Sequence, residues 1–486
     1  MPSRSRGRLP RSANAWFWQK PGRSTPTRST PRQRVSSSVS RNTPPKNLKR
    51  VSVINLGCPK NRIDAEIILA ELAQAGFPIT GDATDAQAVI VNTCAFLEEA
   101  IEESAQVIET QQERRRRGEI ETLLVTGCLP QREPRELVGR FPWVDAFLGL
   151  DQIPEIPGLL KENNHPGQVL VSATPSWNPG REYPRLLSTP SHYAYLRLTE
   201  GCSNCCSYCT IPMIRGPLRL RRTEDILEEA GDLVTLGIKE LILIAQDTAA
   251  HPELSKILEG LERIEGLRWI RLLYAHPAHL EEKIIEQMAA SDKVLNYVDM
   301  PIQHLADSVL ERMNRNVGAD RTERLVKKAR SLDPQFSIRT TVIVGFPAET
   351  EEEFEVLLEG LKRLRFTHLG IFVYSQEEGT QACEMPDQVS WEVKKERAER
   401  LVEFAERMQA EETNRMTGNK HEAVVDFAKE ASEDCVTCVG RLWSSAPEID
   451  RVVEIEGPGV NQGCFGKVEI TGGRNDRIFA RWIESI

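Results

Sequence analysis

The feature that most constrains the fold is an alternation of short β-strand-like runs with amphipathic helical patterns between residue 50 and about residue 375, interrupted by an irregular, proline-rich linker at residues 166–191. Such alternation builds right-handed βαβ units with a parallel sheet. All strands of a parallel sheet point the same way, so their C-terminal ends meet at one edge. Residues that directly follow these strands therefore converge even when they are far apart in sequence. We expect an α/β protein with its functional residues at such edges.

The first three strand-like runs each end in a cysteine: Cys58, Cys94 and Cys128. Because the strands are parallel, we expect the three thiols to converge. Three thiolates can hold three irons of a [4Fe–4S] cluster and leave the fourth iron open. A single buried Cys at a strand end is more often a small hydrophobic residue, but three in matched positions favour ligation. A zinc site is an alternative, although structural zinc usually takes four ligands and no fourth is evident.

Four further cysteines lie close together in Cys202-Ser-Asn-Cys205-Cys206-Ser-Tyr-Cys209. Cys202, Cys206 and Cys209 form a CxxxCxxC pattern, which suits a second [4Fe–4S] cluster with one open iron. Two adjoining CxxC pairs that bind zinc are the other interpretation. That interpretation fails because zinc ribbons separate their two pairs by roughly 15–20 residues. We therefore expect Cys205 not to be a ligand.

Six strand-like runs alternate with amphipathic helices around and after this motif: residues 194–198, 240–245, 268–273, 297–301, 336–345 and 368–374. The pattern predicts a (β/α)6 unit, an incomplete parallel barrel. Barrels of this kind carry their sites at the C-terminal ends of the strands, and the cysteine motif follows the first strand. Polar residues follow the later strands, where they line either a pocket or ordinary loops: Gln246, Asp247, Tyr274, His276, Gln303, His304 and Glu349.

The two ends of the chain differ in charge. Residues 1–50 hold thirteen Lys or Arg and no Asp or Glu, so the rest of the chain is more acidic than the overall charge of −9. We expect residues 1–48 to be disordered and to be an organelle transit peptide, a simple tail or the product of a misassigned start.

Residues 419–486 read as a small β-barrel with eight basic and twelve acidic residues. RNA-binding grooves are normally basic, so this acidic module better suits a basic protein partner.

The CxxxCxxC motif, with Tyr208 before its last cysteine and a partial barrel behind it, resembles the radical S-adenosylmethionine (SAM) superfamily. The three-cysteine domain in front and the small β domain behind resemble the methylthiotransferases, from residue 50 onward. Four segments resemble the branch that modifies ribosomal protein S12: residues 55–61, 245–248, 374–380 and 446–450. The related tRNA-modifying enzymes share the cysteines but lack the last segment. Cys205 and the N-terminal extension depart from the family pattern, and neither affects an expected ligand.

The resemblance implies a domain order: a disordered extension (1–48), a methylthiotransferase domain with an auxiliary cluster (49–165), a radical SAM core (188–418) and an OB-like TRAM domain (419–486). It implies two [4Fe–4S] clusters and SAM as cofactors. The cluster on Cys202, Cys206 and Cys209 would bind SAM, and the cluster on Cys58, Cys94 and Cys128 would supply or carry sulfur. Tyr208 and Gly345 would border the adenosine, with local packing and a plain turn as their respective alternatives.

The implied activity is methylthiolation of the β-carbon of an aspartate in ribosomal protein S12, with a second SAM as methyl donor. The implied partners are S12 and an electron donor such as flavodoxin or ferredoxin. No run approaches the ~18–20 apolar residues of a membrane span, so we do not expect an integral membrane protein. The expected location is the cytoplasm, with organellar import as the alternative. Two other functions remain open: methylthiolation of tRNA, which the acidic C-terminal module disfavours, and a non-catalytic iron–sulfur protein.

Overall fold

The computed structural model describes residues 48–162, 167–431, 436–458, 460–474 and 477–486. The disorder expected for residues 1–48 falls outside these ranges, apart from Leu48. Within them, no helix combines the length and the apolar character needed to cross a membrane.

The N-terminal unit is a five-stranded parallel sheet in the order β1-β2-β3-β4-β5. Its strands are β1 (Val51–Asn55), β2 (Ala88–Thr93), β3 (Thr122–Gly127), β4 (Ala146–Leu148) and β5 (Gln168–Leu170). Its helices are α2 (Pro59–Gln74), α3 (Glu98–Arg116), α4 (Cys128–Arg132), α5 (Pro134–Arg140) and α6 (Ile156–Glu162). Strands β2 and β3 are buried along their whole length, as in parallel sheets covered on both faces. The sequence patterns predicted three of these strands, and β5 lies beyond the boundary expected at residue 165.

The central unit is a six-stranded sheet in the order β13-β12-β11-β10-β9-β6, with parallel pairing throughout. Its strands are β6 (Tyr193–Arg197), β9 (Glu240–Ile244), β10 (Trp269–Leu272), β11 (Val294–Asp299), β12 (Ser337–Val344) and β13 (His368–Val373). Because β6 and β13 are the two edges, the barrel is incomplete. All six strands match predicted runs, so the expected α/β architecture is confirmed.

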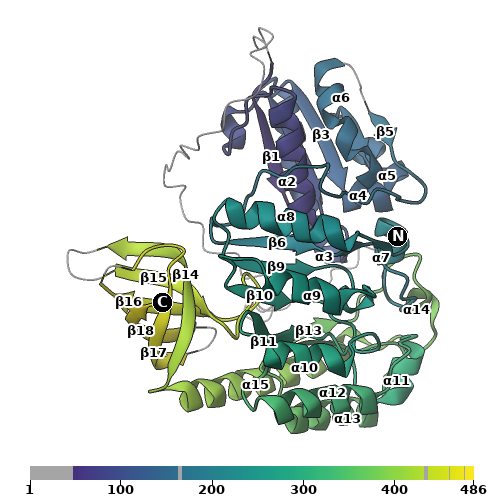
Figure 1. The fold of residues 1–486 in the computed structure, drawn as a ribbon. Helices are drawn as coiled ribbons and strands as arrows, with labels where there is room; N and C mark the ends of the chain where they lie inside the picture. The colour runs from purple at the N-terminus through teal and green to yellow at the C-terminus, as the bar shows by residue number, and fades with distance from the viewer. Residues whose placement is uncertain (1–47, 163–166, 432–435, 459, 475–476) are drawn as a thin grey trace.

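An outer layer of helices covers the central sheet (Figure 1). It contains α8 (Thr223–Thr235), α9 (Leu254–Glu262), α10 (Glu282–Ala290), α12 (Ala319–Leu332) and α13 (Glu351–Leu364). Helix α13 shows how local sequence sets such a helix: Thr350 and Glu353 form a capping box at its start, which satisfies two otherwise unpaired N–H groups. Its buried residues follow helical spacing and face the sheet: Phe354, Leu357, Leu358, Leu361 and Leu364.

Short elements line the edge of the barrel where its strands end. They are β7 (Thr199–Glu200), α7 (Ile211–Arg215), β8 (Arg219–Leu220), α11 (Asp307–Arg312) and α14 (Gln381–Glu384), and β7 pairs with β8 in an antiparallel ribbon. The cysteine motif lies between β7 and α7. The motif is therefore part of a compact loop structure that β7, β8 and α7 hold in place.

The long helix α15 (Trp391–Met416) leads to a closed barrel in the order β14-β15-β16-β18-β17. Its strands are β14 (Lys420–Ala431), β15 (Val436–Leu442), β16 (Val452–Gly457), β17 (Phe465–Arg474) and β18 (Arg477–Ser485). The expected small C-terminal β-barrel is confirmed. Figure 1 shows this yellow C-terminal barrel beside the central unit. The N-terminal unit lies over the edge of the central sheet that carries β6 (Figure 1).

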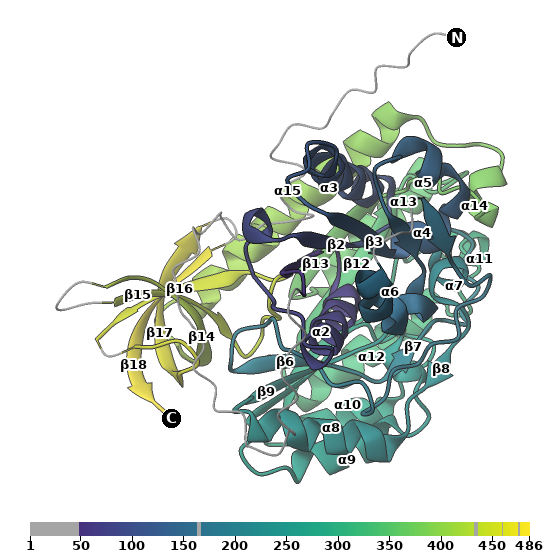
Figure 2. The same cartoon turned by 90° about the horizontal axis from the view of Figure 1, so that it is seen from above.

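The N-terminal and central units share a core. Helix α2 packs against β6, and α4 packs against α7, an arrangement visible from above in Figure 2. One buried hydrophobic cluster combines Ile63 and Ile67 of α2 with Tyr195 and Ile244 of the barrel. The contact between α4 and α7 places the end of β3 close to α7, the helix that directly follows the cysteine motif.

Candidate functional site

The first three predicted ligands lie at the C-terminal ends of their strands. Cys58 caps the start of α2, Cys94 directly follows β2, and Cys128 follows β3 and begins α4. The thiols of Cys58 and Cys128 lie 3.9 Å and 3.5 Å from one atom, Oδ1 of Asn61. A Cβ at Gly57, the neighbour of Cys58, would lie only 3.1 Å from Sγ of Cys94. The fold thus brings the three thiols together.

Burial and the closeness of the three thiols to one another shift the pKa values in this group. Burial raises the pKa of Cys94, and the nearby Cys128 and Cys58 thiols raise it further. Burial also raises the pKa of Cys128, although the Arg215 guanidinium opposes the shift. Three adjacent thiolates repel one another, and a bound metal centre removes that penalty. The three-thiol donor set therefore fits an iron–sulfur cluster.

The second group of thiols sits in a tight loop. The N–H of Cys202 donates to the carbonyl of Gly216 at 3.1 Å, and the N–H of Cys209 donates to the carbonyl of Cys206 at 3.1 Å. Burial raises the pKa of Cys202 to about 11. Burial, reinforced by Cys206, raises the pKa of Cys209 to about 12. Cys205 is exposed, whereas the other three cysteines are partly buried, which agrees with the prediction that it is a bystander.

Glycine is required just before this loop. Gly201 has φ +74°, and a Cβ there would lie 2.1 Å from the carbonyl oxygen of Pro217. That approach is shorter than any real contact, so the chain can pass here only without a side chain. The close passage explains how β7 turns directly into the cysteine motif.

The two residues expected near SAM are both engaged by the barrel. The hydroxyl of Tyr208 accepts a 3.1 Å hydrogen bond from Arg315, and its ring lies edge-on to Phe346. Gly345 has φ +72°, and a Cβ there would lie 2.3 Å from Cγ of Lys394. Packing and turn geometry are therefore sufficient reasons for these residue types. Contact of either residue with SAM stays a prediction.

Polar residues after β9 and β10 form a connected group beside Cys202. Oδ2 of Asp247 accepts hydrogen bonds from Nδ2 of Asn204 at 3.0 Å and pairs with Nδ1 of His279 at 2.6 Å, while Oδ1 accepts the N–H of His276. A cavity of about 490 Å³ is lined by Cys202, Asn204, Asp247 and His279 among others. Of the polar residues for which the sequence left a pocket and ordinary loops open, Asp247 lines this cavity next to the CxxxCxxC motif. Six others do not line it: Gln246, Tyr274, His276, Gln303, His304 and Glu349.

Two contacts that the sequence patterns did not reveal join the segment after Cys58 and Cys128 itself to the central unit. Nζ of Lys60, two residues after Cys58, lies 3.2 Å from the ring centre of Tyr274. Arg215 of α7 bonds to Asn61 and approaches Sγ of Cys128 at 3.6 Å. Lys60 and Asn61 belong to residues 55–61, one of the segments that resemble the S12-modifying branch, but no local pattern indicates that Tyr274 and Arg215, far away in the chain, are their partners.

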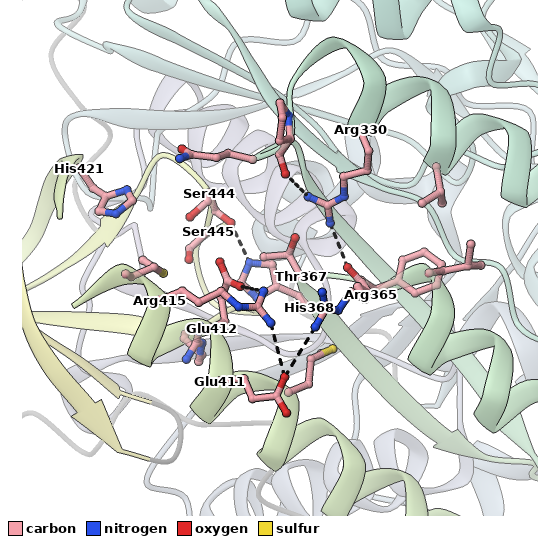
Figure 3. A pocket seen from close by; sticks show the side chains of 18 of the residues that line it. Arg330, Arg365, Thr367, His368, Glu411, Glu412, Arg415, His421, Ser444 and Ser445 are labelled. Carbon is pink, nitrogen blue, oxygen red and sulfur yellow. Dashed lines mark hydrogen bonds and ion pairs between the residues drawn. The ribbon is translucent and has the colours of Figure 1, made fainter. Parts of the chain in front are cut away.

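A second cavity, of about 510 Å³, lies elsewhere (Figure 3). Its lining includes Gln335 and Thr367, which shortly precede β12 and β13. Figure 3 shows Glu411 of α15 paired with Arg365 and with Arg415, which lies four residues further along the same helix. This cavity is at the N-terminal edge of the sheet, opposite the thiols, so its position does not suit the predicted chemistry.

Comparisons with known proteins agree with this geometry. Residues 196–361 match the radical SAM superfamily, residues 50–149 match the uncharacterized protein family UPF0004, and residues 417–483 match the TRAM domain. Among solved structures, the radical SAM methyltransferase TsrM from Kitasatospora setae with cobalamin and a [4Fe–4S] cluster bound has a TM-score of 0.52 at 16% identity, covering 80% of each chain. That likeness shows the fold alone.

Curated relatives are much more similar. The ribosomal protein uS12 methylthiotransferase RimO of Trichlorobacter lovleyi is 40% identical over 90% of this chain and 98% of that protein. The corresponding protein of Geobacter sulfurreducens is 41% identical over 87% of this chain and 96% of that protein. The fold and the site define a radical SAM methylthiotransferase, an enzyme that uses SAM with iron–sulfur chemistry. The chain belongs to the ribosomal protein uS12 methylthiotransferase RimO family.

Proposed function

We propose that this chain attaches a methylthio group to the β-carbon of an aspartate in ribosomal protein S12, using two [4Fe–4S] clusters and two SAM molecules. The observation that carries the proposal is the pair of three-thiol groups, which lie on two units that pack together, with Arg215 of α7 3.6 Å from Sγ of Cys128. The printed names of the relatives support S12 as the substrate.

The proposed roles follow the domain order. Residues 49–165 hold the auxiliary cluster on Cys58, Cys94 and Cys128, and residues 188–418 hold the SAM-binding cluster on the other three cysteines: Cys202, Cys206 and Cys209. When bound, this second cluster and SAM supply the radical chemistry that an unactivated carbon requires. The chain's own residues provide the sulfur ligands, the polar wall at Asp247 and a shared core that excludes water.

Residues 419–486 have the role of a docking module for S12 in this proposal. Their excess of acidic residues, twelve against eight basic ones, suits a basic ribosomal protein, because complementary charge steers association. An external electron donor such as flavodoxin or ferredoxin supplies the reducing electron. The match to the TRAM domain favours tRNA as a second candidate substrate, and the module's charge argues against it.

One assay separates these substrates. The anaerobically reconstituted protein is incubated with SAM, a reductant and either an S12 loop peptide or tRNA, and mass spectrometry looks for an added methylthio group. We expect modification of the aspartate in the peptide and unmodified tRNA. Modified tRNA with untouched peptide would overturn the proposal. The matched control is Cys202→Ala, which should retain the auxiliary cluster and lose the activity.

A further inference from the structure

Two arginines at the interface between the N-terminal unit and the barrel are nearly equivalent. Arg197 and Arg215 are both buried, and both pair with Asp64 of α2 and with Glu200. The four N–O distances lie between 2.6 Å and 3.2 Å. The result is a closed group of two cations and two anions, in which the buried charges balance.

The two guanidinium groups differ in their third partner. Nη2 of Arg197 donates to the carbonyl of Lys60 at 2.8 Å. Nη2 of Arg215 donates to Oδ1 of Asn61 at 2.6 Å and lies 3.6 Å from Sγ of Cys128. Of the pair, it is Arg215 that reaches a sulfur atom of the auxiliary thiol group. Arg197 is therefore an internal control for Arg215, because the two arginines share the same charge and the same ion-pair partners, and Arg215 also contacts a sulfur atom.

A buried cation next to a ligand sulfur has a defined electrostatic effect. An iron–sulfur cluster becomes more negative when it accepts an electron, so a fixed positive charge nearby stabilises its reduced state. Hydrogen bonds to the cluster sulfurs also tune the potential and orient the ligands. Because Asp64 and Glu200 balance the guanidinium charge at longer range, the effect acts through the direct contact with sulfur, which water screens little because Arg215 is buried.

We propose that Arg215 is a positioning residue that holds Cys128 through an N–H···S contact and raises the reduction potential of the auxiliary cluster. This inference rests on the proposed function, because it requires a cluster on Cys58, Cys94 and Cys128. The proposal also predicts that the ion pairs with Asp64 and Glu200 do not by themselves raise the reduction potential, because Arg197 makes the same ion pairs.

The test uses the full-length chain in which Cys202, Cys206 and Cys209 are replaced with Ala, so that any iron signal comes from the auxiliary group. Arg215→Gln, Arg215→Lys and Arg197→Gln are introduced into this background and reconstituted anaerobically. Iron and sulfide content are measured first, and the reduction potential is then determined by redox titration with electron paramagnetic resonance.

We expect Arg215→Gln to lower the potential, Arg215→Lys to restore most of it, and Arg197→Gln to lower it clearly less. Both Gln variants remove one cation from the balanced group, but only Arg215→Gln also removes the contact with sulfur. If Arg215→Gln fails to keep a cluster, retention by Arg215→Lys and Arg197→Gln supports the positioning role, and loss in all three variants contradicts it. Equal shifts in both Gln variants, or no shift in either, also overturn the inference. A background without any iron would instead refute the proposed auxiliary cluster, so the two failures are distinguishable.

Discussion

The hydroxyl of Tyr297 in β11 donates a 2.6 Å hydrogen bond to Oδ2 of Asp450, which joins the barrel to the C-terminal module. Two residues earlier, Glu448 forms a 2.8 Å ion pair with Arg62 of α2. The segment whose sequence resembles the S12-modifying branch therefore contacts both other units. Its structural role is to set the module's position relative to the site.

Removal of the Tyr297 hydroxyl tests this connection. Tyr297→Phe leaves buried Asp450 with one partner fewer, so we expect the free energy of unfolding to fall by about 1–3 kcal/mol. Denaturant titration measures the change. The control is Tyr183→Phe, a residue whose ring packs edge-on against Trp177 and whose change we expect to stay within ~0.5 kcal/mol. Equal stability of Tyr297→Phe and the wild type would contradict the connection.

Acid should also weaken the interface between the central sheet and the C-terminal module, because a buried group of charged residues joins them: Glu240, Asp426 and Arg441. Burial would raise the pKa values of Glu240 and Asp426, but Arg441, with further help from Arg271 and His192, holds both below their usual range. Carboxyls with lowered folded-state pKa values stabilise the protein above their ordinary pKa of about 4, and this contribution is lost as pH falls through the lowered values.

We therefore expect thermal stability to drop steeply below about pH 4. Melting temperatures measured across this range check the expectation. The double variant Glu240→Gln/Asp426→Asn should start less stable at neutral pH and show a shallower acid dependence. A double variant with the wild-type pH profile would show that these carboxyls do not carry the effect.

Gly345→Ala separates a backbone requirement from a cofactor contact. The residue has φ +72° and no room for a Cβ beside Lys394, so we expect a loss of about 1–3 kcal/mol in stability. Gly231→Ala in α8 is the matched control, because open space surrounds it and alanine favours helix by about 0.5–1 kcal/mol. Wild-type stability with weakened SAM binding in Gly345→Ala would instead assign the residue to the cofactor.

Cys205→Ser tests the register of the CxxxCxxC motif. Because Cys205 is exposed beside partly buried neighbours, we expect its replacement to leave iron content unchanged. Cys206→Ser, the adjacent substitution, should lose the SAM-binding cluster. Iron analysis of the two purified variants decides the matter, and iron loss from Cys205→Ser would mean that the predicted register is wrong.

Much of the fold could be predicted because parallel strands produce fully buried apolar runs. The same reasoning missed β4 (Ala146–Leu148) and β5 (Gln168–Leu170), which are only three residues long. Two residues of β5 are exposed, so its composition carries little burial signal. Strand β4 forms because β3 offers a neighbour to pair with, and β5 pairs in turn with β4, a tertiary effect that a local pattern does not contain.

The candidate site also has one part that the sequence predicts and another that it does not. Convergence of Cys58, Cys94 and Cys128 follows from one rule about parallel strands, and the structure brings them together. The partners of Arg215 could not be foreseen, because Asp64 lies 151 residues away and Cys128 lies 87 residues away in sequence. Contacts of this range depend on how the two units dock.

The central claim is that two separate thiol groups each hold a [4Fe–4S] cluster. The most direct measurement is iron and sulfide per chain after full anaerobic reconstitution, compared with the variant in which Cys58, Cys94 and Cys128 are all replaced with Ala. The account predicts about eight irons in the wild type and about four in the variant, which should still cleave SAM. About four irons in the wild type, or zinc in place of iron, would contradict it.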